Sequence, residues 1–236
     1  RLGLEPEVYD EVVEILKDNP NIKVTSVFSH LAAADSPEHD AYTHQQISVY
    51  EKGYKKISEA LGITPIRHIL NSPGIIRFAK YQLDMVRLGI GLYGINPTSE
   101  PGQNLKPAAT LKTVISQIKE IQPGSTVGYG RWGQANTAKT IATIAIGYAD
   151  GFSRAFSRGN GKVFVNGKIA PVIGNVCMDM TMIDITGIEA HEGDDVIIFG
   201  EALPIQQVAE SIGTIPYEIL TNTSERVKRV FFAESI

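Results

Sequence analysis

Residues 67–94 read RHILNSPGIIRFAKYQLDMVRLGIGLYG, and this stretch decides the predicted fold of the first half of the chain. It begins with a short predicted strand at 67–70 and continues through a polar turn at 71–74. Residues 75–81 favour one or two helical turns, and the apolar run at 85–93 favours a second strand. Strand, turn, helix and strand in this order are typical of a βαβ unit with parallel strands.

The preceding residues continue the same alternation. Residues 7–17 carry apolar side chains at helical spacing, and so do residues 41–61, which Gly62 closes. Between these helices, the β-branched run at 22–28 predicts a buried strand. Polar residues follow each predicted strand, where α/β folds place their sites. We therefore predict a parallel α/β layer with its site at the carboxyl ends of the strands.

The composition changes after residue 95. Residues 95–102 are rich in Asn, Pro, Ser and Gly, as is typical of a linker. Beyond residue 108 the segments are short, rich in Val, Ile and Thr, and separated by turn residues, which indicates antiparallel strands. We place the domain boundary near residue 103, giving domains 1–103 and 104–236. The predicted strands of the second domain are 111–121, 140–146, 162–165, 168–173, 181–185 and 195–199.

One dipeptide in the second domain predicts a specific turn. Asn166-Gly167 lies between two of these strands, and Asn-Gly is the strongest short-range signal of a β-hairpin. Residues 204–212 predict a lone short helix, and residues 227–232 predict a last strand.

Composition excludes several classes of function. The 236 residues have a formal net charge of -4 and no basic block, so a nucleic-acid surface is not indicated and a small neutral or anionic ligand stays open. The single cysteine, Cys177, excludes an internal disulfide and has no thiol or histidine partner at metal-ligand spacing. We expect no metal site, no membrane span and a cytoplasmic location. The first methionine is Met85, so we expect the sequence to be part of a longer protein.

Two polar, glycine-bearing turns form a candidate anion site. Asn71 and Ser72 follow one predicted strand, and Gly89 and Gly91 lie within the next. Backbone N–H groups and a hydroxyl in such turns can donate to a phosphate. The alternative is that the glycines only allow close packing, since a glycine pair by itself is weak evidence.

Three further residues are candidates for chemistry. Arg87 lies in an apolar run, so its guanidinium needs a partner unless it reaches water from an edge strand. His30 follows the strand at 22–28 and is a candidate for the same site, although a histidine there is more often a structural hydrogen-bonding residue. Tyr148 lies in the turn GYADG at 147–151, and its alternative role is packing or an interface.

Together these pieces resemble the alanine racemases, which are pyridoxal-phosphate enzymes of fold type III. The resemblance extends over nearly the whole chain in the right order, and its most specific parts are MVRLGIGLYG at 85–94 and GYADG at 147–151. It implies part of an N-terminal (α/β)8 TIM barrel followed by a mostly antiparallel C-terminal β domain. The other matching stretches are RLG at 1–3, SHLAAAD at 29–35, NS at 71–72, VGYG at 127–130 and GNVCMD at 174–179.

The resemblance also implies cofactor-binding roles at matching positions. Arg87 is similar to the arginine that donates to the pyridine nitrogen of pyridoxal 5'-phosphate, and His30 to the histidine that braces it. A guanidinium does not readily release its proton, so the ring nitrogen stays unprotonated and is a weaker electron sink. The residues similar to those that hold the phosphate are Asn71, Ser72, Gly89 and Ile90.

Three more residues match positions that contact the substrate. Tyr148 resembles the tyrosine that moves the α-proton on one face of the substrate and is contributed across a homodimer interface. Met178 matches a residue near the substrate carboxylate, and Arg1 matches a substrate-binding arginine. The implied activity is the interconversion of L- and D-alanine, which supplies D-alanine for peptidoglycan.

Two departures from the family pattern bear on this activity. The family's cofactor lysine lies in a pattern like Lys-Ala-Asn-x-Tyr-Gly, and no lysine of this chain is followed by alanine. We therefore expect that lysine to lie before Arg1 and this chain alone to be inactive. Glu225 stands where some relatives carry a tyrosine near the cofactor.

Two alternative functions stay open from sequence. One is a non-catalytic dimerisation or binding module within a larger polypeptide, which would lack a lysine-bearing strand upstream. The other is a racemase for another amino acid such as serine, because the sequence does not determine the preference for a side chain.

Overall fold

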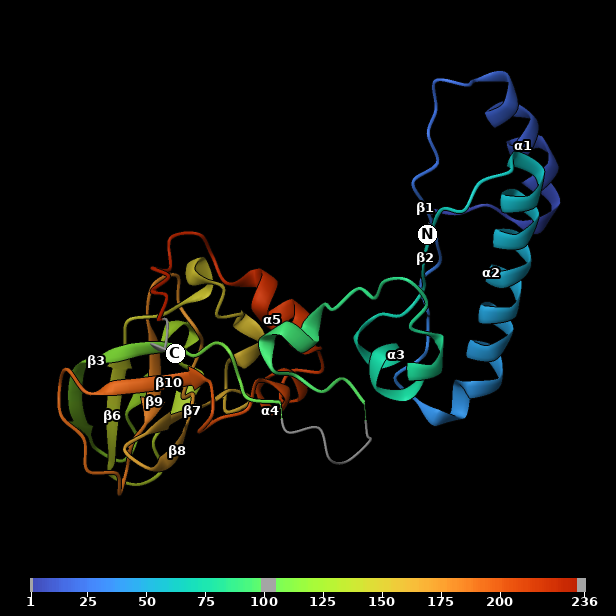
Figure 1. Cartoon of the computed structure of the whole chain (residues 1–236). Coiled ribbons are helices and arrows are strands. Elements are labelled where there is room, and N and C mark those ends of the chain that lie inside the picture. Colours follow the sequence, from blue (N-terminus) through green and yellow to red (C-terminus); the bar gives the residue numbers. More distant parts are fainter. Residues whose placement is uncertain (1, 99–104, 233–236) are drawn as a thin grey trace. The chain divides into compact units, whose positions relative to one another are not determined.

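The chain forms two compact units, Arg1–Ala108 and Ala109–Ile236. A computed structural model describes residues 2–98 and 105–232 (Figure 1). The predicted boundary between residues 103 and 104, and the candidate substrate residue Arg1, lie outside the described residues. Each unit is described here by itself.

The first unit alternates helices and strands as the sequence predicts. Two parallel strands pair in register, with Ser26 opposite Ile66 and Phe28 opposite His68. This alternation with parallel strands is the architecture of an α/β barrel segment. In chain order the elements are η1 (Pro6–Val8), α1 (Tyr9–Asp18), β1 (Ser26–Phe28), η2 (Pro37–His39), α2 (Asp40–Leu61), β2 (Ile66–His68), α3 (Ser72–Arg77), η3 (Ala79–Tyr81) and η4 (Ile90–Tyr93).

Helix α2 provides much of the apolar cover of this unit. Its buried side chains Ile47 and Tyr50 belong to a cluster with Leu31, Leu70 and Phe78. The hydroxyl of Tyr50 donates to the carbonyl of Val27 at 3.0 Å, which ties the helix to β1. Burial raises the pKa of Tyr50 to about 12, so this phenol remains a hydrogen-bond donor at neutral pH.

The prediction of a strand at 85–93 is wrong in its length. Only Met85 forms a bridge with a strand, parallel to His68, and the backbone N–H of Arg87 donates to the carbonyl of Leu70 at 2.9 Å. Beyond this point η4 begins at Ile90. The chain therefore runs beside β2 for a few residues and then turns, because Gly89 makes bonds to a side chain in place of a neighbouring strand.

The second unit is an antiparallel β structure that is nearly closed. Six strands lie in the order β8-β7-β10-β3-β6-β9, and a bridge between Val172 and Ile183 connects the two ends of that order. Such closure removes most of the exposed strand edges. The strands are β3 (Leu111–Ile121), β4 (Thr126–Val127), β5 (Gly133–Gln134), β6 (Lys139–Ile144), β7 (Lys162–Val165), β8 (Lys168–Pro171), β9 (Thr181–Asp184) and β10 (Asp195–Phe199).

The sequence pattern explains most of this sheet. Asn166 and Gly167 have φ values of 44° and 84°, so they form the tight turn between β7 and β8 that Asn-Gly predicts. Along β7 and β9 buried and less buried residues alternate, as expected for strands with one face in a core.

Two predictions near the C-terminus need correction. The second unit contains α4 (Ile205–Glu210) and a further helix, α5 (Pro216–Asn222), where the sequence predicted a lone helix. The signal for α5 was Pro216 at its first position, which presets the backbone angle of a helix start. The described residues 227–232 form no strand, although their apolar run predicted one. Phe231 and Phe232 are 89% and 90% exposed, so these two side chains pack little against the described residues.

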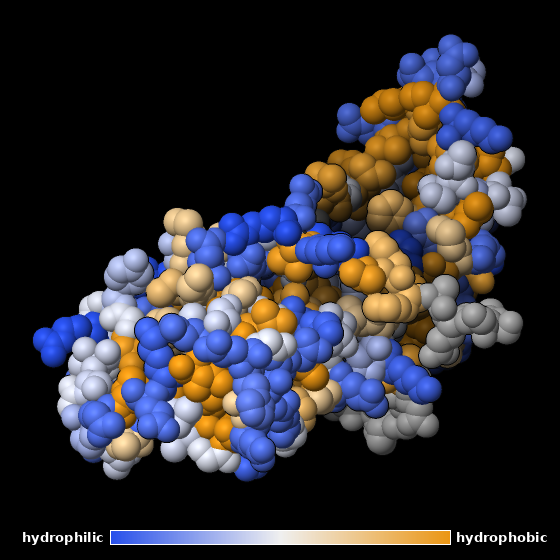
Figure 2. All heavy atoms as spheres, turned by 90° about the vertical axis from the view of Figure 1, so that its left-hand side faces the viewer, coloured by the Kyte–Doolittle hydropathy of each residue, from blue (hydrophilic) through white to orange (hydrophobic). Residues whose placement is uncertain are grey.

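Figure 2 shows apolar side chains at the surface among hydrophilic ones. In the second unit the exposed apolar residues near one another in sequence include Tyr129 with Trp132 and Met178 with Met180. Among the helices described, none is both long enough and apolar enough to cross a membrane.

Ile144 on β6 tests the core of the second unit. It is completely buried, so Ile144→Ala should lower the free energy of unfolding by about 2–5 kcal/mol. Val114 on β3 is 42% exposed, so Val114→Ala should cost less than about 1 kcal/mol. Urea denaturation followed by circular dichroism measures both changes. Equal costs for the two variants would contradict the assigned core.

Candidate functional site

Arg87 lies at the carboxyl ends of β1 and β2 and is held by groups from both. Its guanidinium donates to the carbonyl of Ser29 at 2.7 Å and to those of His68 and Ile69 at 3.3 Å each. The nearest contact is with Nδ1 of His68, at 2.6 Å. Nδ1 of His30 lies 3.5 Å away, at the outer limit of a hydrogen bond. The charge therefore has protein partners, which excludes the alternative of an arginine that simply reaches water.

The contact between Arg87 and His68 determines how the imidazole is protonated. A guanidinium has only donors, so Nδ1 of His68 must accept and carries no proton. Burial and the neighbouring guanidinium both lower the pKa of His68, which keeps it neutral. Phe28 stacks on His68 with ring centroids 5.1 Å apart and also lies 5.2 Å from the Arg87 guanidinium carbon. Burial lowers the pKa of Arg87 from its ordinary value.

Ser72 organises the glycine turn beside Arg87. Its Oγ accepts from the backbone N–H of Gly89 at 2.9 Å and of Gly91 at 3.2 Å. Ser72 is buried and opens α3. Within the described residues its hydroxyl proton has no acceptor, and neither does the backbone N–H of Ile90. These donors belong to one turn and remain available to an anion.

Gly89 and Gly91 differ in how much space surrounds the position of a Cβ atom. A Cβ on Gly91 would lie 2.7 Å from a methyl group of Leu88, which fits the packing alternative for that position. A Cβ on Gly89 would meet only Ser72 Oγ, at 3.7 Å. The missing side chain at Gly89 therefore leaves space next to the Ser72 hydroxyl. A cradle of this kind, with a cation near it, fits the phosphate and ring of a cofactor such as pyridoxal phosphate.

Asn71 and Ile90 have more limited parts in this site. The Asn71 side chain accepts from the N–H of Gly74 at 3.2 Å and donates to the carbonyl of Leu31 at 3.2 Å. It therefore caps α3 and fixes the loop after β1, and one of its amide hydrogens has no acceptor among the residues that the structure describes. Ile90 is 2% exposed, so only its backbone is available to a ligand.

The second unit brings the other two described candidates together. The N–H of Tyr148 donates to the carbonyl of Cys177 and the N–H of Ala149 to that of Met178, each at 3.0 Å. The side chains of Tyr148 and Met178 are 43% and 54% exposed. Within the described residues the Tyr148 hydroxyl has no hydrogen-bond partner. It is thus free to act on a bound molecule.

Two residues of these sites were missed by sequence reasoning. His68 carried a weak signal, because it is a histidine at the end of a buried strand directly before the Asn71 turn. Arg226 carried no signal in the sequence. Its guanidinium donates to Asp150, in the Tyr148 turn, and to Asp179, which follows Met178. Both residues contact partners that are distant in sequence.

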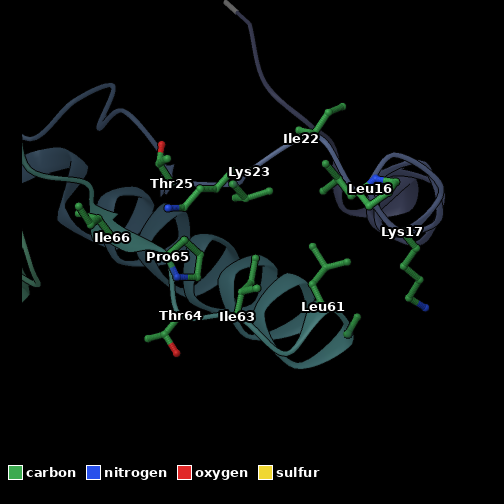
Figure 3. Close-up of a pocket in the computed structure, with 13 residues that line it drawn as sticks. Leu16, Lys17, Ile22, Lys23, Thr25, Leu61, Ile63, Thr64, Pro65 and Ile66 are labelled. Carbon is green, nitrogen blue, oxygen red and sulfur yellow. The ribbon is translucent and has the colours of Figure 1, made fainter.

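A separate cavity of about 880 Å³ lies in the first unit (Figure 3). Its lining includes Leu16 at the end of α1, Leu61 at the end of α2, and residues 22–25 and 63–66. The latter segments lead into β1 and β2, so the cavity is at the amino ends of these strands. Sites of α/β folds lie at the carboxyl ends, and none of the predicted site residues lines this cavity.

The fold and the site define a class of protein: an α/β barrel segment with a cation beside an anion cradle, and a nearly closed β domain presenting a tyrosine. Two family models match, "Alanine racemase, N-terminal domain" over residues 1–97 and "Alanine racemase, C-terminal domain" over residues 108–231. The chain therefore belongs to the alanine racemase family, as the motifs at 85–94 and 147–151 predicted.

Individual relatives agree with this family. The chain is 37% identical to an alanine racemase of Clostridium kluyveri, over 98% of this chain and 61% of the relative. It is 40% identical to alanine racemase 1 of Clostridium acetobutylicum, over 98% of this chain and 62% of the relative. The chain thus spans less than two thirds of the length of these relatives.

Solved structures of the family are similar to the fold. An alanine racemase of Bacillus anthracis with bound L-Ala-P matches with a TM-score of 0.90 and 34% identity, over 99% of this chain and 62% of that one. An alanine racemase of Bartonella henselae with covalently bound pyridoxal phosphate matches with a TM-score of 0.88 and 30% identity, over 98% of this chain and 63% of that one. The prediction of a partial α/β barrel followed by an antiparallel β domain is confirmed.

The neutral state of His68 predicts a specific dependence of stability on pH. The unfolded chain binds a proton on this imidazole below about pH 6.5, whereas the folded chain binds it only at lower pH. Stability from this group is thus complete above about pH 6.5 and is lost as the pH falls toward the lower, folded-state pKa, with a slope of at most about 1.4 kcal/mol per pH unit.

His68→Gln should remove this part of the pH dependence. Urea unfolding at pH 7 and pH 5 measures it, and His191→Gln, at an exposed histidine of the second unit, is the control. A difference between the two pH values that is the same in His68→Gln and in the parent protein would contradict the assignment.

Proposed function

We propose that the protein interconverts L- and D-alanine with pyridoxal 5'-phosphate as its cofactor. The observation that carries this proposal is the juxtaposition of a partnered guanidinium, Arg87, with the donor turn around Ser72 and Gly89 at the carboxyl ends of β1 and β2. The alanine racemase name of the relatives supports the choice of substrate.

The first unit would hold the cofactor through named groups. Arg87 would donate to the pyridine nitrogen, with His68 and His30 beside it. The Ser72 hydroxyl and the backbone N–H of Ile90 would donate to the phosphate, Gly89 would leave the space for it, and Asn71 would keep that turn in place. When bound, pyridoxal phosphate withdraws electrons from the substrate's α-carbon and so makes its proton removable.

Tyr148 would hold and transfer the α-proton on one face of the substrate. Its hydroxyl has no partner within the described residues, and Met178 lies on the loop that its turn contacts, which suits a position near the substrate carboxylate. A racemase needs a base on each face of the α-carbon. The resemblance assigns the second base and cofactor attachment to a lysine before Arg1, and it makes Arg1 a substrate contact.

We further propose that the protein acts as a homodimer in which Tyr148 of one copy serves the cofactor site of the other. Exposed methionine side chains on the loop that contacts the Tyr148 turn, Met178 and Met180, are suited to an interface. The product D-alanine would supply peptidoglycan synthesis in the cytoplasm.

A negative charge tests whether the cradle, formed by Ser72, Gly89 and Ile90, binds the phosphate. Gly89→Asp adds a carboxylate next to Ser72, whereas Gly89→Asn adds a side chain of the same shape without charge. In the full-length protein, Gly89→Asp should raise the Kd for pyridoxal phosphate at least about tenfold over Gly89→Asn, which corresponds to about 1.4 kcal/mol. Absorbance titration measures this, with pyridoxal, which lacks the phosphate, as the control ligand. An equal loss for both ligands would place the phosphate elsewhere.

The shared site is tested with hybrid dimers. Tyr148→Phe should lower racemisation by about 10²–10⁴, as expected for loss of a proton-transfer group, and Gly89→Asp should lower it by weakening cofactor binding. Mixing the two full-length variants should restore activity, because one site of each hybrid then combines an intact Gly89 with an intact Tyr148. If mixing restores nothing although hybrids form, Tyr148 serves its own copy or is a packing residue.

A further inference from the structure

One guanidinium in the second unit joins the two loops that carry Tyr148 and Met178. Nε of Arg226 donates to Oδ1 of Asp150 at 2.7 Å, and Nη2 donates to Oδ1 of Asp179 at 2.5 Å. Asp150 lies two residues after Tyr148, and Asp179 directly follows Met178. Arg226 comes from the segment after α5, so three separate parts of the chain meet at one side chain.

The carboxylate of Asp150 has two partners that matter for the tyrosine. Its Oδ2 accepts from the N–H of Gly147 at 2.9 Å and closes the turn, while its Oδ1 accepts from Arg226. The carbonyl of Asp150 also accepts from the N–H of Ser224 at 3.0 Å. The backbone of Tyr148 is therefore enclosed in a turn that is fixed from outside by the segment containing Ser224 and Arg226.

The Met178 loop lies directly against this turn. A Cβ on Gly147 would come within 2.3 Å of the carbonyl oxygen of Met178 and within 2.4 Å of that of Cys177. Only glycine permits such an approach, which is what allows the N–H groups of Tyr148 and Ala149 to reach these carbonyls. Any displacement of one loop must therefore break hydrogen bonds to the other.

Electrostatics gives Arg226 a role that a neutral side chain could not fill. Asp150 and Asp179 would repel each other if no cation lay between them. Their hydrogen bonds, first that of Asp150 and then that of Asp179, raise the pKa of Arg226 above its ordinary value. Neighbouring Arg229 differs, because within the described part of the chain its guanidinium donates only to the carbonyls of Thr223, Ser224 and Val227 in its own segment.

We infer that Arg226 is a positioning residue for the proton-transferring tyrosine: by holding Asp150 and Asp179 together, it sets the place of the Tyr148 turn against the Met178 loop. The inference rests on the proposed function for the role of Tyr148. The link that Arg226 makes between Asp150 and Asp179, called the clamp below, consists of contacts within this chain and is tested separately.

The first measurement concerns the clamp and does not depend on activity. In Arg226→Gln of the full-length protein, the amides of Tyr148 and Ala149 should exchange with solvent deuterium about fivefold faster than in the parent protein. In Arg229→Gln they should exchange at the parental rate. In Arg226→Lys they should exchange at an intermediate rate, because an ammonium keeps the positive charge but lacks the planar pair of donors of a guanidinium. Unchanged exchange in Arg226→Gln, or the same acceleration in Arg229→Gln, overturns the inference.

A double substitution tests whether Arg226 acts through Asp179. If it does, adding Arg226→Gln to Asp179→Asn should change the exchange of the Tyr148 amide by less than it does in the parent protein. Full additivity of the two effects overturns the bridging role.

The second measurement separates positioning from general loss of stability. One alanine enantiomer loses its α-proton on the face opposite Tyr148, so its exchange with D2O does not need the tyrosine, whereas racemisation does. In Arg226→Gln the ratio of α-proton exchange to racemisation for that enantiomer should rise about fivefold, and in Arg226→Lys it should rise less. A global loss of folded protein lowers both rates together, so an unchanged ratio overturns the positioning role.

The two measurements fail in different ways. A full-length protein that does not racemise alanine at all would contradict the proposed function, while the amide exchange would still decide whether Arg226 holds the two loops. A protein that racemises alanine, with a ratio and an amide exchange that Arg226→Gln leaves unchanged, would support the function and exclude the clamp.

Discussion

The charge on Arg87 is the constraint around which the first unit is built. A partly buried guanidinium is stable only if its donors find acceptors, and Arg87 finds them in the carbonyls of Ser29, His68 and Ile69 and in the His68 ring. These groups belong to the ends of β1 and β2, so satisfying the charge also fixes the strand ends relative to each other. The Ser72 turn follows β2 closely, so the fixed end of β2 also fixes the position of this turn.

In the second unit, the close approach of two backbone segments fixes the site in the way that the Arg87 charge does in the first. Gly147 lies so near the carbonyl oxygens of Cys177 and Met178 that no other residue would fit. The closed sheet brings these loops to one end, and the carboxylates of Asp150 and Asp179 then need the cation that Arg226 provides. Tyr148, whose hydroxyl has no partner within the described residues, thus lies on a turn that hydrogen bonds tie to two other segments, as the proposed proton transfer would require.

Much of the fold could be predicted because its signals are local. Strands β3 and β10 match their predicted ranges, and the Asn166-Gly167 hairpin forms where the dipeptide indicated. The errors arose where a local signal was decided by distant atoms. The run at 85–93 has the apolar pattern of a strand, but its glycines bond to Ser72 Oγ, 17 and 19 residues away, in place of a strand. The run at 227–232 is apolar as well and forms no strand.

By itself the sequence determined the two-part architecture, the family, and the identity of most candidate residues, since motifs such as 85–94 and 147–151 depend only on order along the chain. Only the tertiary structure decided which groups those residues contact. It shows that His68, more closely than His30, contacts Arg87, that the Ser72 hydroxyl accepts from the turn at Gly89, and that Arg226 joins the Tyr148 and Met178 loops. The physical reason is that a buried charge or a lone hydroxyl is satisfied by whichever group folding brings within about 3 Å, and residues far apart in sequence give no local sign of that contact.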